Sequence, residues 1–304
     1  MKPLPSIWVT IKKIQHTLGW NEKELLERMN LNVKAYRSLH IRRNGPSVYS
    51  IQELVNGIGL SVESVATGSI DYKALKERSI GNLVYVPDRY AEAAFSKIRT
   101  SINLLAYLET RLGWQMKRNI LNHFQMSEAL FYDPEAKINF RFPTDLCRYL
   151  VTSGYSQSIF YEMGAYSLVT NKQTPLGEKL SLLGSPEVLY ERIFTEIARQ
   201  SFDQNCDYKL MSLNSRECTV EARFSDVLKD GLNLKKPGNI FACSVRGGSF
   251  SSFTGYIDLP FSRVVEVTCI HRGDSHCKYK ITFSHTQSHH ELAAMNRLKT
   301  NSFH

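Results

Sequence analysis

Two cysteines near the C-terminal end of the chain have the residue type and spacing of metal ligands. Cys269 and Cys277 stand eight residues apart, on either side of the turn Arg272-Gly-Asp274. Thiolates are preferred ligands of Zn²⁺, which binds four soft or borderline donors in a tetrahedron. The pair therefore indicates a structural zinc site, and the alternative interpretation is that both are small buried apolar side chains.

The loop between these cysteines decides whether they can share a metal ion. Residues 263–283 alternate in hydrophobicity and predict a β-hairpin. If the hairpin closes through a five-residue loop, Cys269 lies directly across from Cys277 and both sulfur atoms are on one side. A four-residue loop would send the two sulfur atoms to opposite faces.

The preceding segments predict the elements that must position this hairpin. Residues 90–118 have helical periodicity, and another helix is expected from Ser185 to about Phe202. Residues 208–224 predict a first hairpin, and the glycine- and serine-rich stretch 239–256 predicts a closely packed helix. The sequence therefore predicts helices packed on antiparallel hairpins.

This order of elements, with two cysteines flanking an Arg-Gly-Asp turn, resembles the 4-vinyl reductase domain family over roughly residues 95–284. That family includes the sensor domains of phenol- and xylene-responsive bacterial activators, and it shares an α/β fold with trafficking-complex subunits that hold an acyl chain. The resemblance implies a ligand cavity for a small apolar or aromatic effector. The aromatic candidates for its lining, which would equally suit a plain core, are Phe160, Tyr161, Phe241, Phe250 and Phe253.

The same resemblance implies a third zinc ligand, Cys243, because some relatives use a cysteine and an acidic residue alongside the hairpin pair. The nearby candidates for a fourth ligand are Glu266, His271, Asp274 and His276. Glu266 is three residues before Cys269 and therefore on the other face of a regular strand. It can serve as a ligand only if the strand contains a bulge.

The first 70 residues predict five short helices. Apolar periodicity and capping residues place them at 6–18, 22–29, 33–40, about 51–58 after Ser50, and 61–65. Asn21 with Glu24 forms a capping pair for the second helix, and Asn32 can cap the third. The second and third are joined by a three-residue turn, which is the arrangement of a helix-turn-helix.

This segment resembles the lambda-repressor-like (Xre/Cro) helix-turn-helix family over roughly residues 6–66. The resemblance implies a recognition helix at 33–39 in the major groove and arginines that reach phosphates. The residues it assigns to DNA are Glu22, Lys34, Ala35, Arg37, Ser38, Arg42 and Arg43. The chain departs from the family's pattern at Leu26, Asn30 and His40.

Composition supports an anionic partner. The chain has 38 Lys+Arg against 29 Asp+Glu, a formal charge of +9, and residues 1–80 hold 12 basic against 7 acidic side chains. No apolar stretch approaches the roughly 18 residues of a membrane span, and the start of the chain lacks a secretory signal, so a cytoplasmic protein with reduced cysteines is expected.

These observations predict an α+β protein made of a helix-turn-helix domain (1–68), a linker (69–92), a sensor and dimerisation domain (93–284) and a flexible tail (285–304). The expected function is a one-component transcription regulator, a homodimer that binds double-stranded DNA under control of a small molecule. A signalling adaptor that binds a protein is the alternative, and an enzyme acting on a tetrapyrrole or lipid is a weaker one. Since the chain lacks a nucleophile elbow, a Walker loop and a dinucleotide fingerprint, we expect no catalysis.

Overall fold

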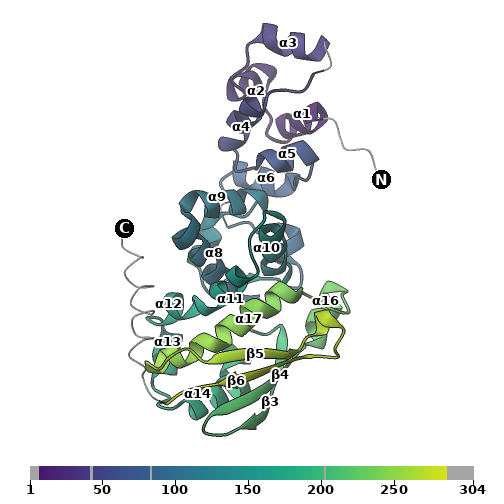
Figure 1. Cartoon of the computed structure of the whole chain (residues 1–304). Helices are drawn as coiled ribbons and strands as arrows, with labels where there is room; N and C mark the ends of the chain where they lie inside the picture. Colours follow the sequence, from purple (N-terminus) through teal and green to yellow (C-terminus); the bar gives the residue numbers. More distant parts are fainter. Residues whose placement is uncertain (1–6, 42–43, 83, 202, 286–304) are drawn as a thin grey trace. The chain divides into compact units, whose positions relative to one another are not determined.

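The computed structural model describes residues 7–41, 44–82, 84–201 and 203–285, and its fold is α+β (Figure 1). The chain divides into two compact units. Unit 1 takes its residues from Met1–Asp88 and Gln115–Asp133, and unit 2 takes its residues from Arg89–Trp114 and Pro134–His304.

The described residues of unit 1 form helices joined by turns and irregular segments. Its helices are α1 (Ile7–Thr17), α2 (Glu22–Arg28), α3 (Val33–Ile41), α4 (Val48–Asn56), α5 (Val62–Thr67), α6 (Tyr72–Ser79), α9 (Trp114–His123) and the 3-10 turn η1 (Glu128–Tyr132). Its core gathers buried apolar side chains from these helices, including Ile14, Leu25, Leu54, Val65 and Leu75. The five helices predicted from the sequence are therefore present, within a larger unit.

Local capping explains where most of these helices begin. Asn21 and Glu24 form the expected capping box, with hydrogen bonds of 3.0 and 2.8 Å, and Asn32 Oδ1 accepts from the N–H of Ala35 at 2.8 Å. The prediction that Ser50 caps the fourth helix is wrong. Ser47 caps α4 instead, because its hydroxyl accepts the N–H of Ser50, and Ser50 is buried in the first turn.

The segment expected to be a linker, 69–92, contains the packed helix α6. Ala74 and Leu75 are buried, and Leu75 belongs to the core of unit 1. The side chain of Gln125 accepts a hydrogen bond from the N–H of Asp71 at 3.0 Å, which ties the residues after α9 to the start of α6. The basic residues around this short apolar pair conceal its helical face in the sequence.

Unit 2 contains the remaining helices and both sheets. Its helices and helical turns are α7 (Asp88–Ala91, which begins in unit 1), α8 (Arg99–Leu112), α10 (Arg141–Thr152), α11 (Ser158–Ala165), α12 (Ser167–Asn171), α13 (Pro175–Ser181), α14 (Pro186–Arg192), the π-helical η2 (Ile193–Ile197), α15 (Ala198–Ser201), α16 (Asp226–Leu232), α17 (Ile240–Ser252), η3 (Phe253–Ile257) and η4 (Ile270–Arg272).

The predicted single helix over 90–118 is wrong. A short strand, β1 (Ser96–Lys97), interrupts it and pairs with β2 (Lys137–Ile138), so α8 starts only at Arg99. The helix then ends at Gly113, whose φ of +87° and ψ of 161° lie in a region that is open almost only to glycine. Apolar periodicity runs across both breaks, and the sequence pattern therefore concealed them.

The main sheet of unit 2 has four antiparallel strands in the order β3-β4-β6-β5. The first predicted hairpin is β3 (Cys206–Leu213) with β4 (Glu217–Phe224), and the second is β5 (Arg263–Thr268) with β6 (Cys277–Thr282). Helix α17 lies across this sheet and packs on β5 and β6 (Figure 1). The core between helices and sheet includes Tyr190, Phe250, Phe253 and Tyr279.

Helix α17 is held against α11 by glycines. A Cβ atom added at Gly164 would lie 1.8 Å from the carbonyl oxygen of Val245, and one added at Gly248 would lie 1.9 Å from that of Tyr161. The two backbones can approach this closely only because neither glycine has a side chain. The expectation that glycines in 239–256 mark close packing is therefore confirmed.

Within the described residues, no helix is both long and apolar enough to cross a membrane. The expected tail, 285–304, lies outside the described residues except for His285.

Candidate metal centre and ligand cavity

Three cysteines and one glutamate converge in unit 2. Sulfur atoms of Cys243, Cys269 and Cys277 and a carboxylate oxygen of Glu266 all lie within 4.8 Å of one another. The three cysteines are buried, and Glu266 is half-buried. All three cysteines predicted as ligands are thus brought together, and the acidic partner is Glu266.

The fold places these four side chains from three segments. Cys243 lies in the first turn of α17, which Asn239 caps by accepting the N–H of Ala242. Cys269 directly follows β5, and Cys277 begins β6. Thr268 pairs with Lys278, a register that sets Cys269 opposite Cys277, as the five-residue loop predicts.

A β-bulge explains why Glu266 joins the cluster. The β5–β6 register shifts between Glu266 and Thr268, which adds one residue to β5 at this point. Val265 and Val267 are exposed on one face of β5, and Glu266 turns to the other. The sequence predicted that Glu266 could be a ligand only if β5 contained a bulge, and this bulge is present.

Glu266 has an oxygen atom whose surroundings suit a metal. Its Oε2 pairs with Arg272 at 3.1 Å, but its Oε1 is buried and lacks a hydrogen-bond partner among the described residues. Burial, with Cys269 adding to it, raises the pKa of this carboxyl to about 7. A buried carboxylate oxygen without a partner is unfavourable unless a proton or a cation satisfies it.

The other three candidates for a fourth ligand have other contacts. Asp274 Oδ2 accepts the N–H of Cys269 at 2.7 Å and so closes the loop. His276 Nε2 lies 3.1 Å from Glu221 Oε1, and the His271 ring packs beside Phe224. None of the three belongs to the cluster of donor atoms.

The thiols show the electrostatics of a metal-ready site. Contact with the Cys243 thiol lowers the pKa of Cys269 to about 6 and the pKa of Cys277 to about 6. The same contacts raise the pKa of Cys243. A cysteine with a lowered pKa gives up its proton more readily, and the thiolate is the form that binds metals.

The distances fit Zn²⁺. A tetrahedron with Zn–S bonds of about 2.3 Å has edges of about 3.8 Å, and Cys243 Sγ lies 3.7 Å from Cys277 Sγ. Three thiolates and one carboxylate match the donor set of a closed structural site. Cys243, Glu266, Cys269 and Cys277 would hold the ion, and it would link α17 to the β5–β6 hairpin.

A cavity of about 120 Å³ lies among the helices and sheet of unit 2. One part of its wall is apolar and includes Leu104, Leu180 and Val245, together with Phe250 and Phe253 from the end of α17 and the start of η3. Phe250 and Phe253 are thus placed where the sequence predicted them. Phe160, Tyr161 and Phe241 are not among its lining residues, and the Phe160 and Phe241 rings pack on each other with centroids 4.9 Å apart.

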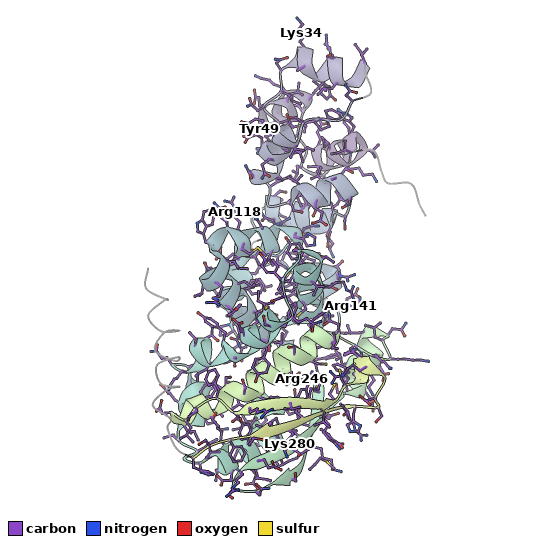
Figure 2. All side chains as sticks on the ribbon, viewed as in Figure 1. Lys34, Tyr49, Arg118, Arg141, Arg246 and Lys280 are labelled. Atoms are coloured by element: carbon purple, nitrogen blue, oxygen red, sulfur yellow. The ribbon has the colours of Figure 1, made fainter. Side chains whose placement is uncertain are left out.

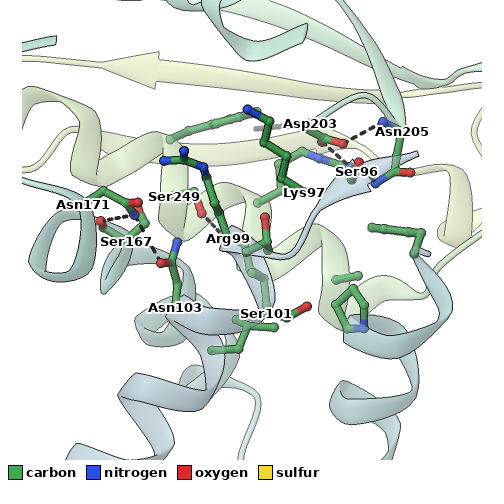
Figure 3. A pocket seen from close by; sticks show the side chains of 18 of the residues that line it. Ser96, Lys97, Arg99, Ser101, Asn103, Ser167, Asn171, Asp203, Asn205 and Ser249 are labelled. Carbon is green, nitrogen blue, oxygen red and sulfur yellow. Dashed lines mark hydrogen bonds and ion pairs between the residues drawn. The ribbon is translucent and has the colours of Figure 1, made fainter. Parts of the chain in front are cut away.

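Polar side chains line other parts of the cavity wall (Figure 3). At one side the Asn205 amide donates to Ser96 Oγ at 2.5 Å, and the backbone N–H of Asn205 donates to Asp203. At another the Asn171 amide donates to the Ser167 carbonyl at 2.8 Å and to Asn103 at 3.2 Å. The cations Lys97, Arg99 and Arg246 also line this space.

These polar lining residues escaped the sequence prediction, which sought aromatic side chains only. Lys97 and Arg99 fall in a stretch whose apolar periodicity predicted a continuous helix. Arg246 gave a usable signal, because it is the one charged residue between Ile240 and Ser252, in a helix of otherwise small, apolar or hydroxyl side chains. A lone arginine in such a helix points to a buried charge with a specific partner.

In unit 1 the residues assigned to DNA lie on α2 and α3. Glu22, Lys34 and Arg37 are exposed, and Ala35 and Ser38 are half-buried (Figure 2 labels Lys34). Arg42 and Arg43 lie outside the described residues.

Two of the chain's departures from the helix-turn-helix pattern fit the fold. Asn30 has a φ of +50°, a left-handed conformation that asparagine tolerates at a turn where glycine is common. Leu26 is buried. The turn between α2 and α3 is therefore formed without glycine.

No family model and no curated protein matched the chain. Among solved structures, an Fe(II) unliganded H-NOX protein from K. algicida matches 64% of this chain and 98% of its own, with 11% identity and a TM-score of 0.43. A mutant of that H-NOX protein matches 62% of this chain and 97% of its own, with 12% identity and a TM-score of 0.44.

Proposed function

We propose that the chain is a one-component transcription regulator, in which unit 1 binds double-stranded DNA and unit 2 binds a small effector molecule. The observation that carries the proposal is the surface of α3. Tyr36 is buried against Trp8, with ring centroids 5.4 Å apart, and this contact fixes the helix. Lys34 and Arg37 on the same helix are exposed, where they can reach base edges and phosphates.

Unit 2 supplies the sensor in this proposal. Its cavity is lined by residues of helices and strands, and it combines apolar walls with a few polar groups, as small-molecule sites generally do. The cysteine and glutamate cluster holds a structural Zn²⁺ that fixes α17, the helix from which both Arg246 and Phe250 reach the cavity. In this proposal the protein is a homodimer and has no catalytic activity.

A salt titration tests the DNA proposal. Binding of the full chain to labelled genomic duplexes is measured by fluorescence anisotropy at several salt concentrations, with Arg37→Ala and with Lys76→Ala. Lys76 is an exposed lysine of α6, and Lys76→Ala removes one positive charge, as Arg37→Ala does. We expect affinity to fall steeply with salt, Arg37→Ala to weaken binding at least about tenfold, and Lys76→Ala to change it little. Absent or salt-independent binding would contradict the proposal.

A second candidate is a signalling adaptor whose helix-turn-helix binds a protein. The observation that favours it is a group of exposed apolar side chains at the end of α3 and the start of α4. Ile41 is 82% exposed, Val48 is 70% exposed and Tyr49 is 61% exposed. Such groups often mark protein contacts. Capture of a reproducible protein partner that the Tyr49→Ser variant loses, without DNA binding, would favour the adaptor.

A further inference from the structure

The cavity of unit 2 is unbalanced in charge. Its lining residues include three cations, Lys97, Arg99 and Arg246, and one carboxylate, Asp203. Glu135, which does not line the cavity, pairs with both Lys97 and Arg99, but its side chain is about half exposed. Three positive charges therefore face two negative ones, Asp203 and Glu135, and the excess positive charge lies where water has little access.

Arg246 is the most buried of these cations. It is 8% exposed, and its nearest carboxylate among the described residues is Asp203, whose Oδ2 lies 4.0 Å from a terminal guanidinium nitrogen. That nitrogen instead donates to Cys206 Sγ at 2.9 Å. Burial raises the pKa of the Cys206 thiol, so the sulfur is neutral and cannot balance the guanidinium.

Asp203 is already engaged by other groups. Its Oδ2 accepts the hydroxyl of Tyr208, and its Oδ1 accepts the N–H of Asn205. A buried guanidinium is ordinarily paired with a carboxylate in close, often bidentate contact. Arg246 lacks such a partner within the described residues, and it faces a cavity.

Arg99 contributes a second donor. Its terminal nitrogen pairs with Glu135, but its Nε is buried without a hydrogen-bond partner in the described part of the chain. The residue begins α8, from a segment separate from α17. The cavity therefore contains two guanidinium groups from different elements, and both have N–H groups that can donate hydrogen bonds to an anion.

The size and the apolar wall limit what the anion can be. An engineered apolar cavity of about 150 Å³ accommodates benzene, and this cavity, at about 120 Å³ and only partly enclosed, limits the ligand to about one ring. Leu104, Leu180, Phe250 and Phe253 provide surface for an apolar body of this size. A multivalent phosphate would leave that surface uncovered, whereas a single carboxylate on a ring would match both parts of the wall.

We propose that the effector is an aromatic monocarboxylate of about one ring, whose carboxylate is bound by Arg246 and Arg99 and whose ring lies among the apolar residues. This inference rests on the proposed sensor function and adds the chemical class of the ligand. Since Arg246 stands three residues after Cys243 on α17, it also offsets negative charge at the metal centre. Arg99 is not part of that centre, so a substitution of Arg99 tests binding of the anion without affecting the charge at the metal ligands.

Isothermal titration of the full chain at neutral pH tests the inference, with benzoate and its neutral isostere benzamide as probes. The variants are Arg99→Gln and Arg246→Met. Arg111→Gln on the same helix as Arg99 is the matched control, because Arg111 is exposed and pairs with Glu162 outside the cavity. Zinc content is measured for each variant, which shows whether Arg246→Met has disturbed the metal centre.

We expect benzoate to bind at least about tenfold more tightly than benzamide, a difference of about 1.4 kcal/mol. Arg99→Gln should weaken benzoate about tenfold and leave benzamide nearly unchanged, and Arg111→Gln should change neither. Equal binding of the two probes, no binding of either, or an Arg99→Gln variant that binds benzoate like the unaltered protein would overturn the inference. DNA binding measured on the same preparation shows whether the proposed function fails with it.

Discussion

At the scale of single residues, the sequence predicted the metal cluster in part. The sequence left two loop lengths open, and Thr268 opposite Lys278 is the register of the five-residue loop, which brings Cys269 and Cys277 together. The role of Glu266 depends on a bulge in β5, which breaks the strict alternation from which sequence reasoning proceeds. The cavity's arginines could not be placed, since their positions depend on the interruption of a helical pattern by β1.

The first residue prediction concerns the thiolates. If the proposed site binds zinc, the purified protein should carry about one ion per chain, and Cys269→Ala and Cys277→Ala should each lose it, because a structural site needs all its donors. Cys218→Ala is the matched control, since Cys218 is equally buried but lies outside the cluster. Elemental analysis gives the result, and equal zinc in all three variants would refute the assignment.

The second residue prediction concerns the carboxylate. Glu266→Gln should weaken zinc binding at least about tenfold, because the amide oxygen is neutral and a poorer donor than the carboxylate. Competition with a chelating dye measures the affinity. Glu217→Gln, on β4 and paired with Lys280, is the control and should leave it unchanged. If both variants hold zinc alike, the fourth ligand is not Glu266.

At the scale of elements, hairpins and short capped helices were predictable because their signals are local. The interruptions between Tyr90 and Arg118 were not predictable, because the apolar periodicity continues across both β1 and Gly113. Helix α17 was anticipated through its glycines, and the crossing with α11 shows the reason.

Adjacent glycines of α17 provide a test of that crossing. Gly248→Ala should lower the free energy of unfolding by at least about 2 kcal/mol, because its Cβ would overlap the Tyr161 carbonyl. Gly247→Ala should be neutral or stabilise by up to about 1 kcal/mol, since its Cβ would lie 3.7 Å from the nearest atom. Urea unfolding compares the two, and equal effects would contradict the described packing.

Helix α6 permits a similar test in unit 1. Leu75→Ala should destabilise the protein by about 2–5 kcal/mol, because Leu75 is 1% exposed in the core of that unit. Ile80→Ala, at the end of the same helix, should have little effect, since Ile80 is 69% exposed. A negligible loss in thermal or urea unfolding for Leu75→Ala would restore the interpretation of 69–92 as a linker.

At the scale of the whole molecule, the order of a helical N-terminal part and an α+β C-terminal part followed from the sequence. The sequence did not predict that the two units alternate along the chain. Residues 115–133 belong to unit 1, although residues 89–114 before them belong to unit 2. The chain therefore passes between the units three times.

The central claim is that unit 1 reads DNA sequence, and selection from a random pool tests it most directly. The full chain, in parallel with Arg37→Ala, is used to capture duplexes of random sequence, which are then counted by sequencing. We predict that the unaltered protein enriches one motif, as two half-sites about one helical turn apart if it is a dimer, and that Arg37→Ala loses that enrichment. No enriched motif, or the same motif with the variant, would contradict the account.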